Sequence, residues 1–258
     1  MNPPNRAQRK IVKFSVIIPT LREEKRIGAL LAALEAQTFG GEWEILVCDG
    51  GSQDQTRAQV EKFSRAQFLD CERGVSRQRN AGARVAQGEL LVFMDADDMP
   101  PPRFLEQIAR SYARWPFSVA CPWFFAHDGS FFTRCAYFGF NIGFWLGQST
   151  LRTGSGVCIV ARRRDFLKSG GFDETMHLGE DVKLLRTLCP RYGWHRHLLV
   201  PLGTSGRRFE HDGGAQLLWF YAKISPFLLL GMWKTLQKFE YRSAPYGEAR
   251  RGKGKLEG

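Results

Sequence analysis

The residues of this chain best suited to chemistry are the aspartates that end the segment Leu90–Asp98, LLVFMDADD. The apolar run 90–94 predicts a buried strand. Side chains alternate along a strand, so Asp95 and Asp97 are expected on one side, about 6–7 Å apart, and Asp98 on the other. Two carboxylates at that separation suit a divalent cation beside a phosphate or a sugar hydroxyl. The alternative is an acidic loop that only caps the next helix.

Other polar residues follow the strands predicted earlier in the chain. The β-branched run 14–18 predicts a strand that ends before Thr20, and Asp49 with two glycines closes a second predicted strand at 44–48. Glycine permits positive φ and close backbone approach to a ligand. Because ligands of open α/β sheets bind beyond the carboxyl ends of the strands, these positions predict a phosphate site at one sheet edge.

The first half of the chain alternates strand and helix patterns. The strands are expected at 14–18, 44–48, 67–70 and 90–94, and the helices at 23–37, 52–63, 76–86 and 104–115. Ser52 and Gln55 fit a capping box that opens the second helix. This alternation predicts parallel strands joined by right-handed crossovers, and therefore an α/β fold.

The second half is less regular. Strands are expected at 117–125, 156–161 and 198–201, and helices at 180–188 and, interrupted by Lys223 and Pro226, at 215–239. The aromatic-rich stretch 131–146 is left without an assignment.

Composition places further bounds on the protein. Lys and Arg number 37 against 26 Asp and Glu, for a net charge of +11 over 258 residues. Such a balance favours anionic partners such as nucleotide phosphates, nucleic acid or an acidic membrane surface, although a generally basic protein is the alternative. With no apolar signal region at the start and no run of 18 apolar residues, we expect a cytoplasmic protein without a spanning helix.

Several motifs occur in a characteristic order. They are FSVIIPTLREE, EILVCDGGSQDQT, GVSRQRNAGARVAQGELLVFMDADD, GGFDE and GEDVKLLRTL. Together they resemble a family 2 inverting nucleotide-sugar glycosyltransferase of GT-A fold, over roughly residues 14–209. Thr204–Phe209 resembles the TSxRRF segment of a compact subgroup of that family.

The resemblance implies a mostly parallel, Rossmann-like central sheet flanked by helices. We expect a basic arm at 1–12, a GT-A domain at 13–212 divided into a nucleotide-binding half (13–100) and an acceptor half (101–212), an apolar helical extension at 213–241 and a basic tail at 242–258.

The resemblance also implies the donor-binding residues. They are Pro19, Thr20, Glu23, Asp49, Gly50, Arg79, Asn80, Asp95, Ala96, Arg207 and Arg208. By this comparison Asp49 accepts a hydrogen bond from the base, commonly uracil. Glu23 accepts from a ribose hydroxyl, and Arg207 with Arg208 grips the diphosphate as the segment closes over the donor.

Metal and base assignments follow from the same resemblance. Asp97 is the principal ligand of Mn²⁺ or Mg²⁺, Asp95 approaches the ribose or the metal, and His211 is a further candidate ligand. Asp181 is the candidate catalytic base, because inverting transfer needs a carboxylate that takes the proton of the acceptor hydroxyl. Its place at a helix N-terminus is expected to lower its pKa. The alternative is that Glu180 and Asp181 are ordinary first-turn acids.

The segment 217–239 carries large apolar groups on most faces, with three lysines spaced along it. A helix in the membrane interface, a helix pair on the core or a dimer contact would all look like this. The aromatic residues and the charge favour a peripheral site at the inner face of a membrane and a hydroxyl acceptor that is lipid-borne or partly apolar.

Three other functions remain as alternatives: a nucleotidyltransferase, a non-catalytic nucleotide-sugar binder and a membrane-docked partner protein. A nucleotidyltransferase would need a Gly-rich, Arg-bearing loop after the first strand, where the sequence reads Pro19-Thr20-Leu21-Arg22. Nucleic-acid binding is not expected, since the basic residues are dispersed and no recognition motif is present. The sequence leaves the oligomeric state open.

Overall fold

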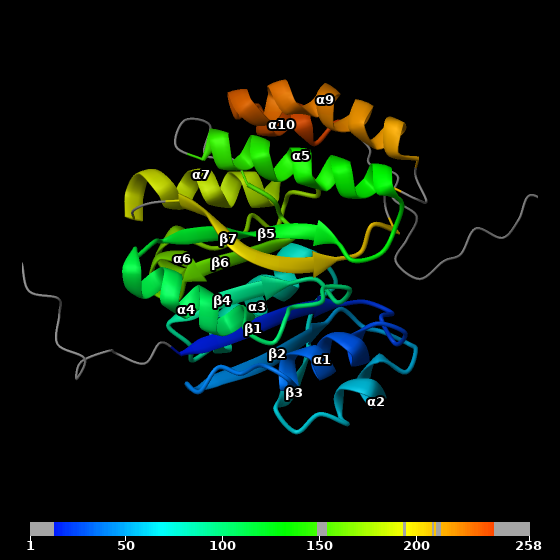
Figure 1. Ribbon diagram of the computed structural model, residues 1–258, viewed down its shortest axis with the longest axis vertical. Coiled ribbons are helices and arrows are strands. Elements are labelled where there is room, and N and C mark those ends of the chain that lie inside the picture. The colour runs from blue at the N-terminus through cyan, green and yellow to red at the C-terminus, as the bar shows by residue number, and fades with distance from the viewer. Residues whose placement is uncertain (1–12, 149–153, 193–194, 208, 210–212, 240–258) are drawn as a thin grey trace, which may run out of the picture.

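The computed structural model describes residues 13–148, 154–192, 195–207, 209 and 213–239 (Figure 1). Within these ranges one sheet has the strand order β3-β2-β1-β4-β6-β5-β7. The strands are β1 (Phe14–Thr20), β2 (Trp43–Asp49), β3 (Ala66–Asp70), β4 (Leu90–Met94), β5 (Val119–Ala126), β6 (Cys158–Arg162) and β7 (His195–Thr204). The helices are α1 (Ile27–Glu35), α2 (Thr56–Val60), α3 (Val75–Val85), α4 (Phe104–Arg114), α5 (Phe131–Gly147), α6 (Arg163–Ser169), α7 (Glu180–Tyr192), α9 (Gly214–Leu230) and α10 (Trp233–Leu236).

The strands of the first half are parallel, as the alternation of patterns predicts. β1 pairs in parallel with β2 and β4, and β2 with β3. β6 runs antiparallel between β4 and β5, and β7 pairs in parallel with β5. The carboxyl ends of every strand except β6 therefore meet at one edge of the sheet, where parallel-sheet proteins place their ligands.

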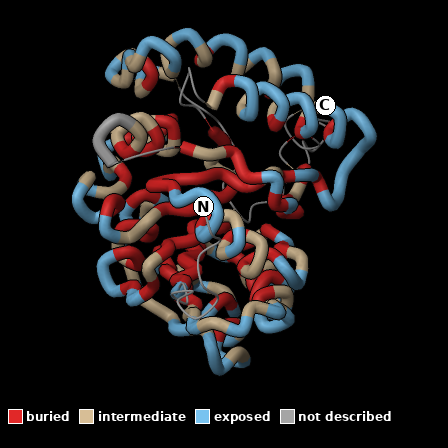
Figure 2. The backbone as a smooth tube through the Cα atoms, turned by 60° about the vertical axis from the view of Figure 1, so that its left-hand side comes forward, coloured by how far each residue is buried: buried red, intermediate tan, exposed pale blue. Residues whose placement is uncertain are grey.

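Alternating side chains of the strands bury two apolar layers, one on each face of the sheet. Val16 and Ile18 of β1 face a layer that includes the apolar stripe of α1, together with α2 and α4. Ile17 faces the opposite layer, with α3, α6 and α7. Figure 2 shows the strands as the buried interior between these helices. Burial of one such aliphatic side chain contributes roughly 1.5–3 kcal/mol to the free energy of unfolding. Each central strand buries several of them, so these strands hold the sheet edge rigidly.

A third helical layer covers the β5–β7 end of the sheet, where α5 and α9 lie side by side (Figures 1 and 2). Tyr137 of α5 packs edge-on against Phe124 of β5, with ring centroids 5.3 Å apart. Phe140 of α5 packs similarly against Tyr221 of α9, at 5.9 Å. The stretch left unassigned from the sequence is therefore a helix.

Several boundaries differ from the sequence-based expectations. The predicted capping box is wrong, because α2 begins at Thr56 and the Ser52 hydroxyl donates to Asp49 instead. α9 continues through Pro226 and ends at Gly231, whose φ of +69° favours glycine. β7 is longer than predicted because its pairing with β5 extends past Pro201, across a register shift in β5.

The predicted basic arm at 1–12 and basic tail at 242–258 lie outside the described residues, and the division of the chain at residues 100 and 212 stays a prediction. Among the helices that the structure describes, none combines the length and the apolar character that crossing a membrane requires.

Candidate active site

A pocket of about 180 Å³ opens at the carboxyl ends of β1 and β4. Five predicted donor-site residues line it: Pro19, Thr20, Glu23, Asp95 and Ala96. Five further lining residues were not predicted: Leu21, Arg73, Gly74, Val75 and Gln78. The structure thus brings residues from the ends of two strands and from the start of α3 around one cavity.

Gln78 is the most informative residue that the sequence did not reveal. Its side-chain amide donates to the backbone oxygens of Thr20 and Cys48, at 2.7 Å each, and so joins the carboxyl ends of β1 and β2. The sequence held one signal for this role. Gln78 directly precedes Arg79 and lies four residues before Gly82, which places Gln78 and Gly82 on the same face of the helix. A Cβ at Gly82 would lie 2.6 Å from Ile17, so α3 packs directly on the sheet at that face.

Asp49 is buried and its carboxylate accepts four hydrogen bonds from the protein. Thr20 Oγ1 and Ser52 Oγ donate to Oδ1, at 2.9 and 2.6 Å. The backbone N–H groups of Gly51 and Ser52 donate to Oδ2, at 3.0 and 2.7 Å. In this structure Asp49 therefore fixes the loop after β2, while its contact with a base stays a prediction.

The acidic residues after β4 form a turn and do not continue the strand. The backbone N–H of Asp98 donates to the oxygen of Asp95, and the carboxylate of Asp98 accepts from the Asp95 N–H at 2.9 Å. The strand alternation used to place Asp95 and Asp97 therefore stops at Met94. Asp98 is buried as the brace of this turn, and burial together with the charges of Asp95 and Asp97 raises its pKa.

Arg79 is buried and connects the acidic turn to the start of α7. Its Nη2 lies 2.9 Å from Asp95 Oδ1, and its Nη1 lies 3.9 Å from Glu180 Oε1. Its guanidinium also lies 5.3 Å from the centre of the Phe172 ring. A buried cation is stable only when it is paired, so Arg79 holds the acidic turn after β4 and the start of α7 in a fixed relation.

Arg207 reaches the same turn from the end of β7. Its Nε lies 3.0 Å from Asp97 Oδ2, and its Nη2 lies 3.8 Å from Glu23 Oε1. Glu23 is buried, and desolvation raises its pKa although Arg207 and Arg26 oppose that effect. Arg207, a predicted diphosphate contact, thus pairs with both Asp97, the predicted metal ligand, and Glu23, the predicted ribose contact.

Asn80 lies away from the pocket and holds the GGFDE segment. Its Nδ2 donates to the oxygens of Phe172 and Glu174, and its Oδ1 accepts from the Phe172 N–H, all at 2.9 Å. The structure therefore gives it a place in the loop that precedes α7. Gly50 follows β2, where a Cβ would lie 3.2 Å from Gln78, so the residue allows the close approach of α3.

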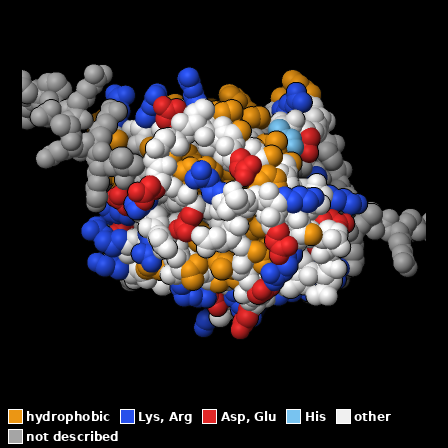
Figure 3. Space-filling model, turned by 90° about the horizontal axis from the view of Figure 1, so that it is seen from below, with side chains coloured by type: hydrophobic (Ala, Val, Ile, Leu, Met, Phe, Trp, Pro, Cys, Tyr) orange, Lys and Arg blue, Asp and Glu red, His pale blue; other side chains and the backbone are white. Residues whose placement is uncertain are grey.

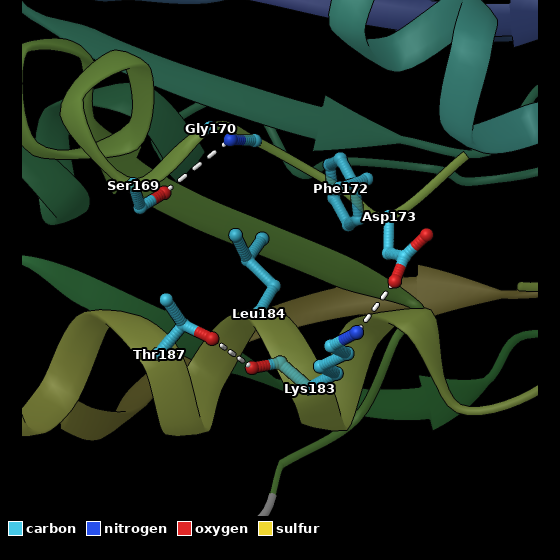
Figure 4. A pocket seen from close by; sticks show the side chains of 8 residues that line it. Ser169, Gly170, Phe172, Asp173, Lys183, Leu184 and Thr187 are labelled. Atoms are coloured by element: carbon cyan, nitrogen blue, oxygen red, sulfur yellow. Dashed lines mark hydrogen bonds and ion pairs between the residues drawn. The ribbon is translucent and has the colours of Figure 1, made fainter. Parts of the chain in front are cut away.

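A second cavity, of about 240 Å³, lies between the GGFDE segment and the outer side of α7 (Figure 4). There Lys183 donates to Asp173 at 2.5 Å, and this bond, together with those from Thr175, lowers the pKa of Asp173 to about 2. None of the predicted site residues lines this cavity. Its ion pair joins α7 to the preceding loop and so supports the position of Asp181.

Asp181 is half-buried in the first turn of α7. Its pKa is raised to about 7, first by desolvation and then by the charge of Glu180. The Val182 N–H and Arg79 oppose that rise without overcoming it. The sequence-based expectation of a lowered pKa is therefore wrong: burial outweighs the favourable field of the helix N-terminus. A carboxylate with a pKa near 7 suits proton transfer at neutral pH.

Gly156, just before β6, leaves room for this carboxylate. A Cβ at Gly156 would lie 2.4 Å from Asp181 Oδ2. We predict that Gly156→Ala turns the Asp181 side chain and lowers kcat by roughly tenfold to a hundredfold, in line with the sensitivity of reaction rates to small misplacements. Steady-state kinetics beside a thermal melt will check this, with an unchanged kcat as the contradicting result. Gly139→Ala in α5, where no atom lies within 4 Å of the new Cβ, is the control.

Asp95 and Asp97 are carboxylates of the kind that hold a divalent cation, and in this structure each is paired with an arginine, Asp95 with Arg79 and Asp97 with Arg207. Mg²⁺ is usually held by one or two carboxylates together with phosphate oxygens of the substrate. Within the described ranges no group of three or more His, Cys, Asp or Glu is arranged to hold a metal by itself, so the remaining ligands would come from a bound phosphate. His211 and Arg208 lie outside the described residues.

The parallel sheet with its pocket at the carboxyl edge defines the chain as a GT-A type α/β protein, as the resemblance implied. Residues 15–167 match the family described as "Glycosyl transferase family 2". Because that match spans more than half of the chain, the protein belongs to glycosyl transferase family 2.

Relatives of known activity are similar over part of their length. "UDP-Glc:alpha-D-GlcNAc-diphosphoundecaprenol beta-1,3-glucosyltransferase WfgD" of Escherichia coli is 37% identical over 89 residues, which cover 33% of this chain and 35% of WfgD. "Poly(ribitol-phosphate) beta-N-acetylglucosaminyltransferase TarS" of Staphylococcus aureus is 39% identical over 95 residues, covering 34% of this chain and 17% of TarS. The aligned region thus spans about a third or less of these relatives.

Solved structures extend the likeness beyond that region. The crystal structure of S. aureus TarS 1–349 superposes with a TM-score of 0.62 at 25% identity, covering 72% of this chain and 58% of that one. The same fragment in complex with UDP-GlcNAc gives a TM-score of 0.59 at 25% identity, covering 72% and 56%.

Proposed function

We propose that this protein transfers a sugar from a nucleoside diphosphate donor, most simply a UDP-sugar, to a hydroxyl acceptor with inversion. One observation carries the proposal: the buried guanidinium of Arg79 joins Asp95, which lines the pocket, to the helix start that bears Asp181. A donor in the pocket and an acceptor at Asp181 would then face one another across a fixed distance. Family membership and the UDP-sugar named for WfgD and bound by TarS support the donor class.

In this proposal Asp181 takes the proton of the acceptor hydroxyl. The hydroxyl oxygen forms a bond to the anomeric carbon as the bond from that carbon to the diphosphate oxygen breaks, and the electron pair leaves with the nucleoside diphosphate. Mn²⁺ or Mg²⁺ held by Asp95 and Asp97 would supply positive charge against the diphosphate. Arg207 is positioned to move from Asp97 and Glu23 onto a phosphate oxygen when donor binds.

The acceptor in this proposal carries its hydroxyl on a lipid-linked or partly apolar molecule. The diphosphoundecaprenol acceptor in the name of WfgD supports that class. The apolar outer layer of this protein supports it independently, as argued below.

A thermal-shift panel tests the donor proposal on the full chain. We expect UDP-sugars with Mn²⁺ to raise the melting temperature, since a ligand at about 100 times its Kd adds roughly 2.7 kcal/mol to the free energy of unfolding. For a domain of this size that corresponds to about 5–10 °C. GDP- and dTDP-sugars identify the base preference. Absence of any shift with millimolar nucleotide sugars and either cation would overturn the proposal.

A further inference from the structure

Helix α5 carries aromatic residues on both of its sides. Tyr137 is buried with Thr133 and Asn141, while Phe131, Phe138 and Trp145 are exposed. Asn141 is satisfied inside, because its Nδ2 donates to the oxygens of Phe124 and Tyr137 at 2.7 Å each. The helix therefore uses hydrogen bonds to attach itself to β5 and presents aromatic rings to its surroundings.

Helix α9 continues this apolar surface beside α5. Trp219 and Leu230 are 73% and 74% exposed. With Lys223 and Pro226 between them they follow a helical spacing of three or four residues, which places them on one outward face. Scattered exposed apolar residues are normal, but a contiguous apolar surface marks an interaction site. We call the exposed large apolar residues of the two helices the outer apolar face: Phe131, Phe132, Phe138, Ile142, Trp145, Leu146, Trp219, Leu229 and Leu230.

The charged residues within the two segments that carry this face have a single sign. Residues 131–148 and 213–239 include no Asp or Glu, whereas Arg134, Lys223, Lys234 and Lys238 all lie there and are exposed. The opposite end of the molecule, viewed from below in Figure 3, displays acidic and basic side chains beside one another. Apolar rings flanked by basic side chains, with no carboxylate, complement a surface that is apolar below and anionic above.

The outer apolar face adjoins the candidate active site. Asp128, three residues before α5, accepts two hydrogen bonds from the segment after β7: the Gly206 N–H donates at 2.5 Å and the Ser205 hydroxyl at 2.8 Å. The next residue, Arg207, pairs with Asp97. Both α5 and α9 therefore begin at the sheet edge that bears the pocket and run away from it along one side of the molecule (Figure 1).

We propose that the outer apolar face of α5 and α9 docks on an anionic lipid bilayer, with the helices lying in the interface and the pocket edge held at the membrane surface. This inference deepens the proposed function, and rests on it for one point: the acceptor hydroxyl belongs to a molecule anchored in that bilayer. No helix needs to span the membrane, because the outward rings and lysine stems enter only the interfacial region.

Vesicle flotation of the full chain tests the docking. We expect binding to phosphatidylglycerol–phosphatidylcholine vesicles at low salt, and weaker binding to phosphatidylcholine alone. Trp219→Ser with Leu230→Ser should reduce the partition coefficient by roughly tenfold or more, since each residue removes a large apolar contact. Lys223→Glu with Lys234→Glu should abolish the preference for anionic lipid.

A matched control lies elsewhere on the surface. Leu199 is 75% exposed on β7 and Trp115 is 55% exposed after α4, so Leu199→Ser with Trp115→Ser removes similar residues from another place and should leave vesicle binding unchanged. Equal binding by both double variants, or no binding by the wild type, overturns the proposal. A wild-type dimer in sedimentation that Trp219→Ser with Leu230→Ser dissociates would assign the face to a second copy and also overturn it.

Flotation requires no turnover, so its outcome is separate from that of the sugar-transfer proposal. The UDP-sugar thermal shift should be the same in Trp219→Ser with Leu230→Ser as in the wild type, which also shows that the variant is folded. Loss of flotation with a retained shift supports membrane docking, whereas flotation without any donor shift leaves docking standing and removes the proposed activity.

Discussion

Asp181→Asn is expected to lower kcat by about 10³-fold while donor binding persists. The estimate lies in the middle of the range for loss of a general base. Asparagine retains the shape of the side chain and can still accept from the Val182 N–H, which lies 2.7 Å from Asp181 Oδ1. Donor binding is expected to persist because Asp181 does not line the pocket in which we propose that the donor binds. Kinetics together with the UDP-sugar thermal shift will measure both effects, and a near-normal kcat would show that another group is the base.

The pH profile of the wild type gives the same assignment a second test. The base must be ionised, and the pKa of Asp181 is raised to about 7 by desolvation and by Glu180. We therefore expect kcat/KM to rise about tenfold per pH unit below 7 and to level off above it, as for a single essential base. Arg79 and Cys121 are the other titratable groups that interact with this carboxyl.

Glu180→Gln is the control that separates the two neighbouring carboxylates. Removal of the Glu180 charge favours the ionised form of Asp181, so the variant should remain active and its profile should move to lower pH. A loss as large as that of Asp181→Asn would assign the base role to Glu180, whereas an active variant whose profile moves to higher pH would show that Glu180 does not raise the pKa of Asp181.

A rise in pH should lower the contribution of Asp181 to protein stability, although it raises the activity. The carboxyl has a pKa of about 7 in the folded protein against an ordinary value of 3.8. Because the pKa of Asp181 is higher in the folded protein than in the unfolded chain, protonation of Asp181 stabilises the fold. This stabilisation is fully present below pH 3.8 and is lost as the pH rises through about 7. Each pKa unit corresponds to about 1.4 kcal/mol, so the shift from 3.8 to about 7 sets an upper limit of about 4–5 kcal/mol. Asp181→Asn should therefore raise the melting temperature at pH 8 and leave it nearly unchanged near pH 4.

The parts of the fold that could be predicted are those with a local signal. The apolar run of β4 followed at once by aspartates indicated both the strand and its position at the site. The start of α7 at Glu180 followed from its acidic first turn and the apolar stripe behind it. Family motifs then supplied the roles that spacing alone left open.

The parts that could not be predicted depend on partners far away in the chain. α5 escaped assignment because its buried face holds Thr133, Tyr137 and Asn141, whose hydrogen bonds to β5 and to Ser205 the sequence does not display. The raised pKa of Asp181 depends on burial by the surrounding fold. For Arg79 the sequence predicted a contact with the donor but could not show its pairing with Asp95 and Glu180, which only the fold brings to it.

Asp97→Ala is expected to abolish the cation-dependent part of donor binding and to lower kcat/KM by about 10²–10³-fold. In the proposed site Asp97 offers a carboxylate beside Asp95 and the donor diphosphate, and metal assistance contributes several kcal/mol to such reactions. At about 1.4 kcal/mol per factor of ten, that loss corresponds to roughly 3–4 kcal/mol. Thermal shifts with UDP-sugar, measured with and without Mn²⁺, should no longer differ in the variant.

Arg207→Gln tests whether Arg207 and the cation compete for Asp97, as this proposal requires. Its guanidinium now lies 3.0 Å from Asp97 Oδ2, so a cation must compete with it in the absence of donor. The variant should therefore bind Mn²⁺ alone more tightly, as measured by calorimetry, and bind UDP-sugar more weakly if Arg207 moves to a phosphate. Tighter binding of both would leave Arg207 as a counter-ion that has no part in holding the donor.

Asp70→Ala is the matched control for Asp97→Ala, because Asp70 is a carboxylate at the same sheet edge that pairs with Arg57 at 2.6 Å and does not line the pocket. It should keep the Mn²⁺-dependent shift and near-normal kinetics. Asp97 and Arg207 form a partly exposed pair, which contributes at most about 1 kcal/mol to folding, so Asp97→Ala should melt within a few degrees of the wild type. A cation-dependent shift that survives in Asp97→Ala and is lost in Asp70→Ala would place the metal at the end of β3 and remove Asp97 from its site.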